Sequence, residues 1–332
     1  MNKLHSALAI ASFTIAATAF AADNSFDKTL TVSSGANVTI STGSGYIKVT
    51  PGTDNQIHVV AHLRPNHSSG NADADSRIQQ IVANPPVTQS GDNVTIGCTH
   101  CGDLYKNIAI DYDVTTPKSI SLHAATGSGN VTVANIDGTV TATSGSGDIN
   151  TENLAAVAKL QTGSGSIRAS GIRGGANLQT GSGDIDLHQT APGDVRASTG
   201  SGNIHLHGTN GTLTTSTGSG DIDVDGQPTV DWKLHTGSGD IRMNVGNNAK
   251  FSLDADTGSG SIHVDQPMTM QGTLNRHHVT GTVNGGGALI KAGTGSGDII
   301  IKGTSSVSET RTTVVLPGAT DCVANPTLAA CK

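Results

Sequence analysis

Residues 180–226 read TGSGDIDLHQTAPGDVRASTGSGNIHLHGTNGTLTTSTGSGDIDVDG, and this stretch decides the fold because it contains one short pattern three times. Each copy begins with Thr-Gly-Ser-Gly and continues with a polar residue, Ile and an alternating polar and apolar run. Alternation with a period of two is typical of a strand with one buried face. A unit of about 18 residues cannot bury that face alone, so neighbouring units are expected to stack.

The pattern extends far beyond this stretch, because the Gly-Ser-Gly turn occurs ten times in the chain. From Ser128 to Ser259 the steps are 18, 18, 18, 19, 18, 19 and 21 residues. The last step of 37 residues is close to two periods and predicts one coil that has drifted from the pattern. The central serines of the turns are Ser44, Ser128, Ser146, Ser164, Ser182, Ser201, Ser219, Ser238, Ser259 and Ser296.

Aligning the periods on the turn gives three apolar columns, which predict two half-buried strands in each coil. The second column is broken only by Thr151 and Ala169. The first column is Val131, Ile149, Ile167, Ile185, Ile204, Ile222, Ile241, Ile262 and Ile299. The second is Val133, Leu187, Leu206, Val224, Met243, Val264 and Ile301. The third, in the returning strand, is Leu122, Val140, Ala158, Ala176, Val195, Leu213, Trp232, Leu253 and Ile290.

These columns predict an all-β fold, a β-solenoid of coils of about 18 residues with two strands each, for which we expect a right-handed sense. At about 4.8 Å per coil, nine intervals from Ser128 to Ser296 would span about 43 Å. Hexapeptide helices and calcium-binding nonapeptide rolls fit poorly, because their aliphatic and aspartate spacings are absent. We expect the turn glycines to permit left-handed dihedral angles and the next Asp, Asn or Ser to bond the turn backbone.

The composition agrees with a thin, repetitive β structure. The 332 residues include 43 Gly, with 2% aromatic and 14% charged residues, which excludes a coiled coil and argues against a helical enzyme. No apolar run approaches the length of a membrane-spanning helix. The formal net charge is -7 and the Lys and Arg residues are scattered, so we expect neither nucleic acid nor an anionic membrane as a partner.

The first 21 residues are typical of a signal peptide. Lys3 precedes an apolar stretch over residues 6–20, and Ala19, Phe20 and Ala21 supply a small-x-small cleavage site. The mature chain is therefore expected to begin near Ala22 and to be exported, to the periplasm or to the extracellular space. No Cys follows the cleavage site, which argues against a lipid anchor.

Export makes disulfides the favoured state of the four cysteines. They fall into two close pairs, Cys98 with Cys101 and Cys322 with Cys331, and local pairing is the favoured one of three connectivities. A redox centre or half of a zinc site at Cys98 and Cys101 is the alternative.

The rest of the chain divides around the regular repeats of residues 122–301. We expect one solenoid domain over residues 22–304, followed by a tail at 305–332. Residues 26–49 resemble a first coil, after which the pattern is interrupted. Residues 71–83 predict a short helix, and further strands are predicted at 93–97 and 108–114; the helix and a disulfide turn would cover the open end of the solenoid.

Several of these motifs together resemble the bacterial DUF4097 family. They are the N-terminal coil, the segment from Ile110 to Pro117, the repeated Thr-Gly-Ser-Gly-Asp-Ile, and the segment from Val279 to Ala288 before the last turn. The resemblance runs from Phe26 to about Ile301 and implies an envelope-associated or exported β-solenoid with an adhesive or cell-envelope role. The family supplies no catalytic residues to carry over.

The most distinctive chemical cluster is predicted on three adjacent coils. The alignment places Asp186, His205 and Asp223 in one column, and His188, His207 and Asp225 in the next. Imidazole and carboxylate ligands at this spacing could hold zinc or nickel. A solvated surface of His and acidic residues is the simpler interpretation, so no metal site is expected.

The turn serines are not expected to be nucleophiles, because none lies in a Gly-x-Ser-x-Gly elbow. The turns are not nucleotide loops either, because a strand follows each of them. We therefore expect a non-enzymatic protein without a cofactor that binds an envelope polysaccharide or a surface protein. A secreted carbohydrate-active β-helix enzyme, a polysaccharide lyase or hydrolase, is one alternative, and a structural envelope-stress component is another.

Overall fold

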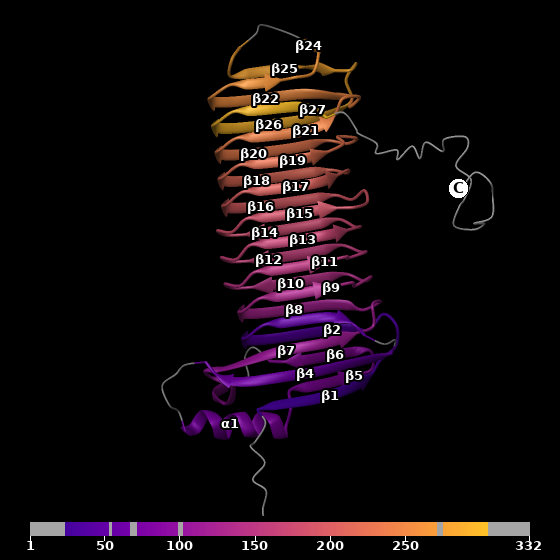
Figure 1. Ribbon diagram of the computed structural model, residues 1–332, viewed down its shortest axis with the longest axis vertical. Helices are drawn as coiled ribbons and strands as arrows, with labels where there is room; N and C mark the ends of the chain where they lie inside the picture. The colour runs from indigo at the N-terminus through magenta and orange to yellow at the C-terminus, as the bar shows by residue number, and fades with distance from the viewer. Residues whose placement is uncertain (1–23, 53–54, 67–71, 99–101, 271–274, 305–332) are drawn as a thin grey trace, which may run out of the picture.

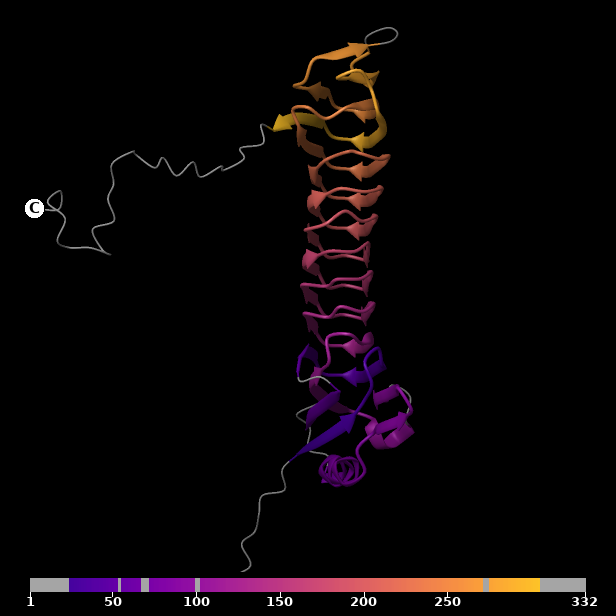
Figure 2. The same cartoon turned by 90° about the vertical axis from the view of Figure 1, so that its right-hand side faces the viewer.

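The computed structural model describes residues 24–52, 55–66, 72–98, 102–270 and 275–304. The predicted signal peptide, the tail and three of the four cysteines lie outside these residues. The described chain forms a long rod whose strands run across its long axis (Figure 1). Seen from the side, two sheets lie back to back along the rod (Figure 2). The predicted β-solenoid is confirmed, while its right-handed sense stays a prediction.

The first sheet, sheet A, has 13 strands and contains the strands that follow the turns. Most neighbours pair in parallel, and only β1 with β4 and β4 with β7 are antiparallel. In spatial order sheet A consists of β1 (Ser25–Thr31), β4 (Gln56–Pro65), β7 (Ile108–Thr116), β3 (Ile47–Pro51), β9 (Val131–Ala134), β11 (Ile149–Glu152), β13 (Ile167–Ile172), β15 (Ile185–Gln189), β17 (Ile204–Thr209), β19 (Ile222–Gly226), β21 (Ile241–Gly246), β27 (Ile299–Thr304) and β23 (Ile262–Val264).

The second sheet, sheet B, has 14 strands and contains the returning strands. Antiparallel pairs occur only at its two ends, between β5 and β6 and between β25 and each of its neighbours. In spatial order sheet B consists of β24 (Met268–Met270), β25 (His278–Val283), β22 (Phe251–Ser259), β26 (Ala288–Ser296), β20 (Trp232–Ser238), β18 (Leu213–Ser219), β16 (Val195–Ser201), β14 (Ala176–Thr180), β12 (Ala158–Thr162), β10 (Val140–Ser144), β8 (Ser121–Ser128), β2 (Asn37–Ser44), β6 (Asn93–Gly97) and β5 (Val87–Ser90).

The predicted columns form the core between the sheets. Residues of each column pair in register from strand to strand, as Ile185 does with Ile204, and the inward side chains are buried. Trp232 lies on an inward position, as predicted, and its indole N–H donates to the carbonyl oxygen of Gly211 at 3.0 Å. Ile262 and Val264 are the exceptions, because β23 at the edge of sheet A leaves both partly exposed.

Glycine is required at the turns mainly because stacked turns approach each other closely, and only in part because of the left-handed dihedral angles that the sequence predicts. Gly183 does not have a left-handed φ, yet a Cβ atom there would lie closer than 3.0 Å to the carbonyl oxygen of Gly165. A Cβ atom on Gly127 would likewise lie 2.5 Å from the carbonyl oxygen of Gly43. The close approach of stacked turns therefore selects glycine, while positive φ angles occur only at some second glycines, such as Gly220 at 152°.

Two ladders of polar side chains join successive turns. In the regular coils the buried Thr, or Ser144, that opens a turn donates to a carbonyl of the neighbouring turn, as Thr180 does to Gly165 at 2.7 Å. In most coils the polar residue after the turn accepts an N–H from the adjacent coil, as Asp184 does from Asn203 at 2.8 Å. The sequence predicts that this residue bonds the backbone of its own turn. It bonds the neighbouring coil instead, because the coils lie about 4.8 Å apart.

The C-terminal end corrects the prediction of a drifted coil. Strands β20 and β21 pair with β26 and β27, which in turn pair with β22 and β23. The last coil of the sequence therefore lies between the two coils that precede it, and Ser128 and Ser296 are not nine intervals apart. The long final step contains β24 and β25, which close this end of sheet B in antiparallel pairing.

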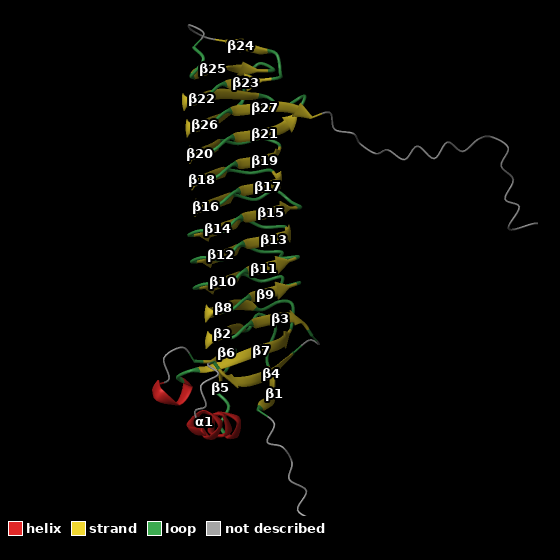
Figure 3. Ribbon diagram, turned by 60° about the vertical axis from the view of Figure 1, so that its left-hand side comes forward, coloured by secondary structure: helices red, strands yellow, loops and turns green. Residues whose placement is uncertain are grey.

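The N-terminal end confirms the predicted helix and strands and corrects the first coil. Helix α1 (Ala72–Ala83) covers this end, with Ile78 and Ile81 buried (Figure 3). The predicted strands correspond to β6 and β7, and a 3-10 helix, η1 (Gly102–Tyr105), precedes β7. Strands β2 and β3 form the first coil, but β1 pairs antiparallel with β4. Among the described residues, no helix is long and apolar enough to cross a membrane.

Candidate polar site on sheet A

The outer face of sheet A brings the predicted His and Asp residues together. Asp186 pairs in register with His205 and His205 with Asp223, while His188 pairs with His207 and His207 with Asp225. The apolar residues between them point into the core, which leaves these six side chains on one outward surface. We call them the His/Asp patch: Asp186, His188, His205, His207, Asp223 and Asp225.

Cross-strand contacts with His and Arg side chains occupy the carboxylates of the patch. The Nδ1 atom of His205 lies 3.1 Å from Oδ2 of Asp223, and that of His207 lies 2.7 Å from Oδ2 of Asp225. Arg168 lies 3.6 Å from Asp186 on the N-terminal side. These side chains are partly exposed, so each pair contributes little to stability but fixes the orientation of its carboxylate.

Arg242 closes the patch on the C-terminal side. Its guanidinium lies 2.8 Å from Asp221, 2.5 Å from Asp240 and 3.5 Å from Asp223. The hydrogen bond from Arg242 lowers the pKa of the Asp221 carboxyl below its usual value of 3.8, and the same contact raises the pKa of Arg242. One guanidinium therefore partly compensates the charge of three carboxylates on this face.

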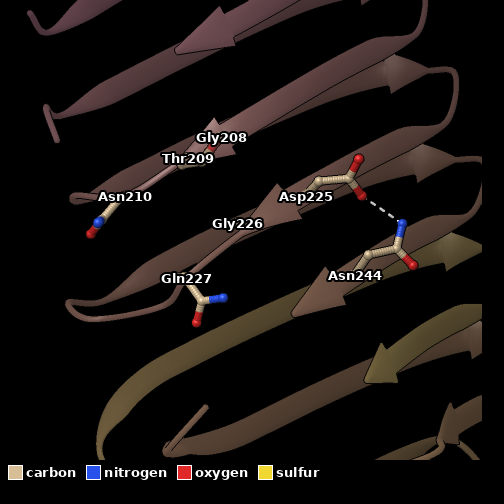
Figure 4. A pocket seen from close by; sticks show the side chains of 7 residues that line it. All are labelled: Gly208, Thr209, Asn210, Asp225, Gly226, Gln227 and Asn244. Atoms are coloured by element: carbon tan, nitrogen blue, oxygen red, sulfur yellow. Dashed lines mark hydrogen bonds between the residues drawn. The ribbon is translucent and has the colours of Figure 1, made fainter. Parts of the chain in front are cut away.

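A surface hollow of about 530 Å³ adjoins the patch, beside the ends of strands β17, β19 and β21 (Figure 4). Its polar groups are largely engaged, because Asp225 also accepts a hydrogen bond from the Asn244 amide at 2.5 Å. The side chains of Asn210 and Gln227 also line the hollow. The seven lining residues are Gly208, Thr209, Asn210, Asp225, Gly226, Gln227 and Asn244.

The His and carboxylate side chains of the patch are not grouped as metal ligands. Within the described residues, no three or more His, Cys, Asp or Glu side chains are placed to hold a metal ion. Asp223 lies against His205 and Arg242, and Asp225 lies against His207 and Asn244.

Sequence reasoning missed Arg242 and Asn244, although the same alignment could have found them. Both continue the patch columns by one coil, since Asp223 pairs with Arg242 and Asp225 with Asn244.

Cys98 follows β6 directly, while Cys101, Cys322 and Cys331 lie outside the described residues, so the disulfide pairing stays a prediction.

Comparisons with known proteins identify the fold family. The sequence profile of a family described as Toastrack DUF4097 matches residues 28–302. A search of curated proteins finds no match. Among solved structures, a "putative adhesin" from Bacteroides fragilis is 15% identical, with a TM-score of 0.35 and coverage of 83% of this chain and 96% of that one. A "putative cell adhesion protein" from Clostridium sporogenes is 8% identical, with a TM-score of 0.21 and coverage of 84% and 100%.

Proposed function

The chain belongs to the Toastrack DUF4097 family, and on that premise we propose that it is an exported, non-enzymatic protein that binds a polymer of the cell envelope. The signal-peptide pattern of residues 1–21 supports export. Adhesion through this binding is the function that we infer for the rod.

One observation carries the proposal: polar residues repeat in register over the coils of both faces. Outward positions such as Asp186, His205 and Asp223 recur at about 4.8 Å along the rod. A polymer presents its own groups at regular intervals, so many weak contacts can add along such a face. A folded protein partner would instead need an irregular patch complementary to its own surface.

The proposal is tested with the chain from Ala22 onward and a panel of insoluble envelope polysaccharides. Sedimentation of the protein with a polymer and newly formed reducing ends are measured in the same tubes. We expect sedimentation with at least one polymer and no release of sugar ends. Absence of sedimentation with every polymer would overturn polymer binding.

The same assay distinguishes binding from catalysis. Release of sugar ends by the wild-type protein, lost in Asp223→Asn and Asp225→Asn, would establish the enzyme alternative. Asn150→Ala serves as the control, because Asn150 lies in the same column of this face two strands before Asp186 and its loss removes no carboxylate. For metal binding, zinc titration calorimetry of the wild type and of the His205→Ala, His207→Ala double variant is expected to show no difference.

A further inference from the structure

The outer face of sheet B carries a straight column of cations. Lys159 of β12 pairs in register with Asn177 of β14, which pairs with Arg196 of β16. The column continues from Arg196 through Thr214 of β18 to Lys233 of β20. All three cationic side chains are exposed. We call Lys159, Arg196 and Lys233 the cation column.

Nothing in the described part of the molecule neutralises these three charges. None of them takes part in an ion pair among the described residues, whereas the next cation along, Lys291, lies 3.8 Å from Asp254. Two acidic residues, Asp194 and Asp231, precede β16 and β20. Their carboxylates accept backbone N–H groups of the adjacent coil, from Thr212 at 3.0 Å and from Leu289 at 2.9 Å.

The spacing of the column is regular. Lys159 and Arg196 are two strands apart, as are Arg196 and Lys233, which places neighbouring cations about 10 Å from each other. The intervening positions hold Asn177 and Thr214, which offer hydrogen bonds without charge. In an extended glycan with alternating 1,3 and 1,4 linkages, the length of one pyranose ring is comparable to the spacing of neighbouring strands. A carboxylate on every second sugar would therefore lie opposite a cation of the column at each repeat of two sugars.

A hollow of about 470 Å³ lies beside the column and has room for a sugar ring. It forms where Gly175 has no side chain, next to Val157, whose side chain is 55% exposed. Asn177, Arg196 and Thr214 line its inner side. The hollow thus combines an apolar surface, hydrogen-bonding groups and one cation of the column with one carboxylate, that of Asp194, which accepts the Thr212 N–H.

We propose that the face of sheet B binds a linear acidic polysaccharide with a carboxylate on alternate sugars, laid along the rod axis over the cation column. This rests on the proposed function and specifies its polymer. The acidic face of sheet A in a second copy is the competing occupant. Arg168 and Arg242 already lie against carboxylates of that face and compensate part of its negative charge, whereas the cation column has no such partners among the described residues.

The test uses the chain from Ala22 onward and a labelled hyaluronate oligosaccharide that carries a carboxylate on alternate sugars and spans the column. The test variant is Lys159→Gln, Arg196→Gln, Lys233→Gln. The matched control is Lys48→Gln, Lys118→Gln, Lys250→Gln, which removes three exposed cations elsewhere. We expect the test variant to bind about tenfold or more weakly and the control to bind like the wild type. Equal binding by both variants would overturn the proposal.

A second variant pair probes the hollow. Val157→Asp places a carboxylate beside the bound polymer, and Val157→Asn places a neutral group of the same size there. Weaker binding of Val157→Asp than of Val157→Asn, with the difference removed at about 1 M salt where screening acts within about 3 Å, supports the proposal. Equal binding of the pair at low salt contradicts it.

Three further outcomes identify the alternatives. Binding of duplex DNA as tightly as hyaluronate would overturn recognition of the glycan in favour of a general polyanion surface. A wild-type dimer that the Lys159, Arg196, Lys233 variant converts to a monomer would assign the face to a second copy. Sedimentation with neutral polymers but no binding of hyaluronate would overturn this inference and leave the proposed function intact.

Discussion

The middle of the rod and its C-terminal end follow the same repeat but different rules of assembly. From β8 to β21 each coil stacks on the coil before it, and every coil has neighbours on both sides. At the C-terminal end the last coil lies between its two predecessors, and β23 has a neighbour on one side only. Ile241 is fully buried, whereas Ile262 in the same column is partly exposed. A repeat thus specifies the shape of a coil, and its neighbours determine how much that coil buries.

The largest expected effect comes from removing the same side chain in the two regions. Ile241→Ala leaves a cavity in a fully buried column and should lower the free energy of unfolding by about 2–5 kcal/mol. Ile262→Ala, in the partly exposed end coil, should cost about 1 kcal/mol. Urea unfolding followed by circular dichroism measures both losses, and the fluorescence of Trp232 reports the coil next to Ile241. Equal losses would show that burial at the end coil matches that in the middle.

The next effect concerns the close approach of stacked turns. Gly127→Ala places a methyl group 2.5 Å from the Gly43 carbonyl oxygen, so adjacent turns must separate at a cost of about 1–3 kcal/mol. Gly43→Ala is the matched control, because no atom of the described residues lies within 4 Å of a Cβ atom there. Thermal unfolding of the two variants compares them directly. A similar loss in both would attribute the glycine requirement to the conformation of the turn instead of to stacking.

A smaller effect tests the threonine ladder within the middle of the rod. The Thr180 hydroxyl donates to Gly165 at 2.7 Å and accepts the N–H of Gly183 at 3.2 Å, so Thr180→Val should cost about 1–2 kcal/mol. Thr215 is also buried, but its hydroxyl has no hydrogen-bond partner among the described residues, and Thr215→Val should be neutral or stabilising. The midpoints of urea unfolding of Thr180→Val and Thr215→Val measure this difference. A larger loss of stability for Thr215→Val would refute the ladder as the source of stability.

The smallest effect is the pH dependence of the Asp221 pair. Because Arg242 lowers the pKa of Asp221 below 3.8, the pair contributes fully above pH 3.8 and is lost as the pH falls through the lower folded-state value. Asp221→Asn should therefore destabilise the protein by about 0.2–1 kcal/mol at neutral pH and by nothing in strong acid. Asn203 makes the same inter-coil bond one coil earlier, so the ladder survives the change.

Arg242→Gln alone and together with Asp221→Asn completes a double-mutant cycle, measured as stability against pH. The coupling between the two residues should disappear as the pH falls below the folded-state pKa of Asp221. A difference between wild type and Asp221→Asn that persists unchanged in acid would exclude the ion pair as its cause.

Sequence alone predicted the patch accurately, because every coil uses the same alignment. The columns of Asp186 with His205 and of His188 with His207 follow from counting residues after each turn, and the structure pairs them as counted. Which side chain contacts each carboxylate could not be predicted in this way, since these contacts depend on side-chain directions in three dimensions. The cation column could have been found by the same count, as the third residue before the Thr of the turn, in every second coil.

The sequence by itself determined the length of the coil, the apolar columns and the terminal helix, because alternation and turn spacing are local properties of a strand and its corner. Only the tertiary structure decided which coil neighbours which. The coil around Ser296 pairs with those around Ser238 and Ser259 in equally good register, so local pattern allows several orders of stacking. In the folded chain β24 and β25 extend sheet B beyond β22, while β26 lies between β22 and β20, an order that long-range strand pairing fixes and the local repeat does not encode.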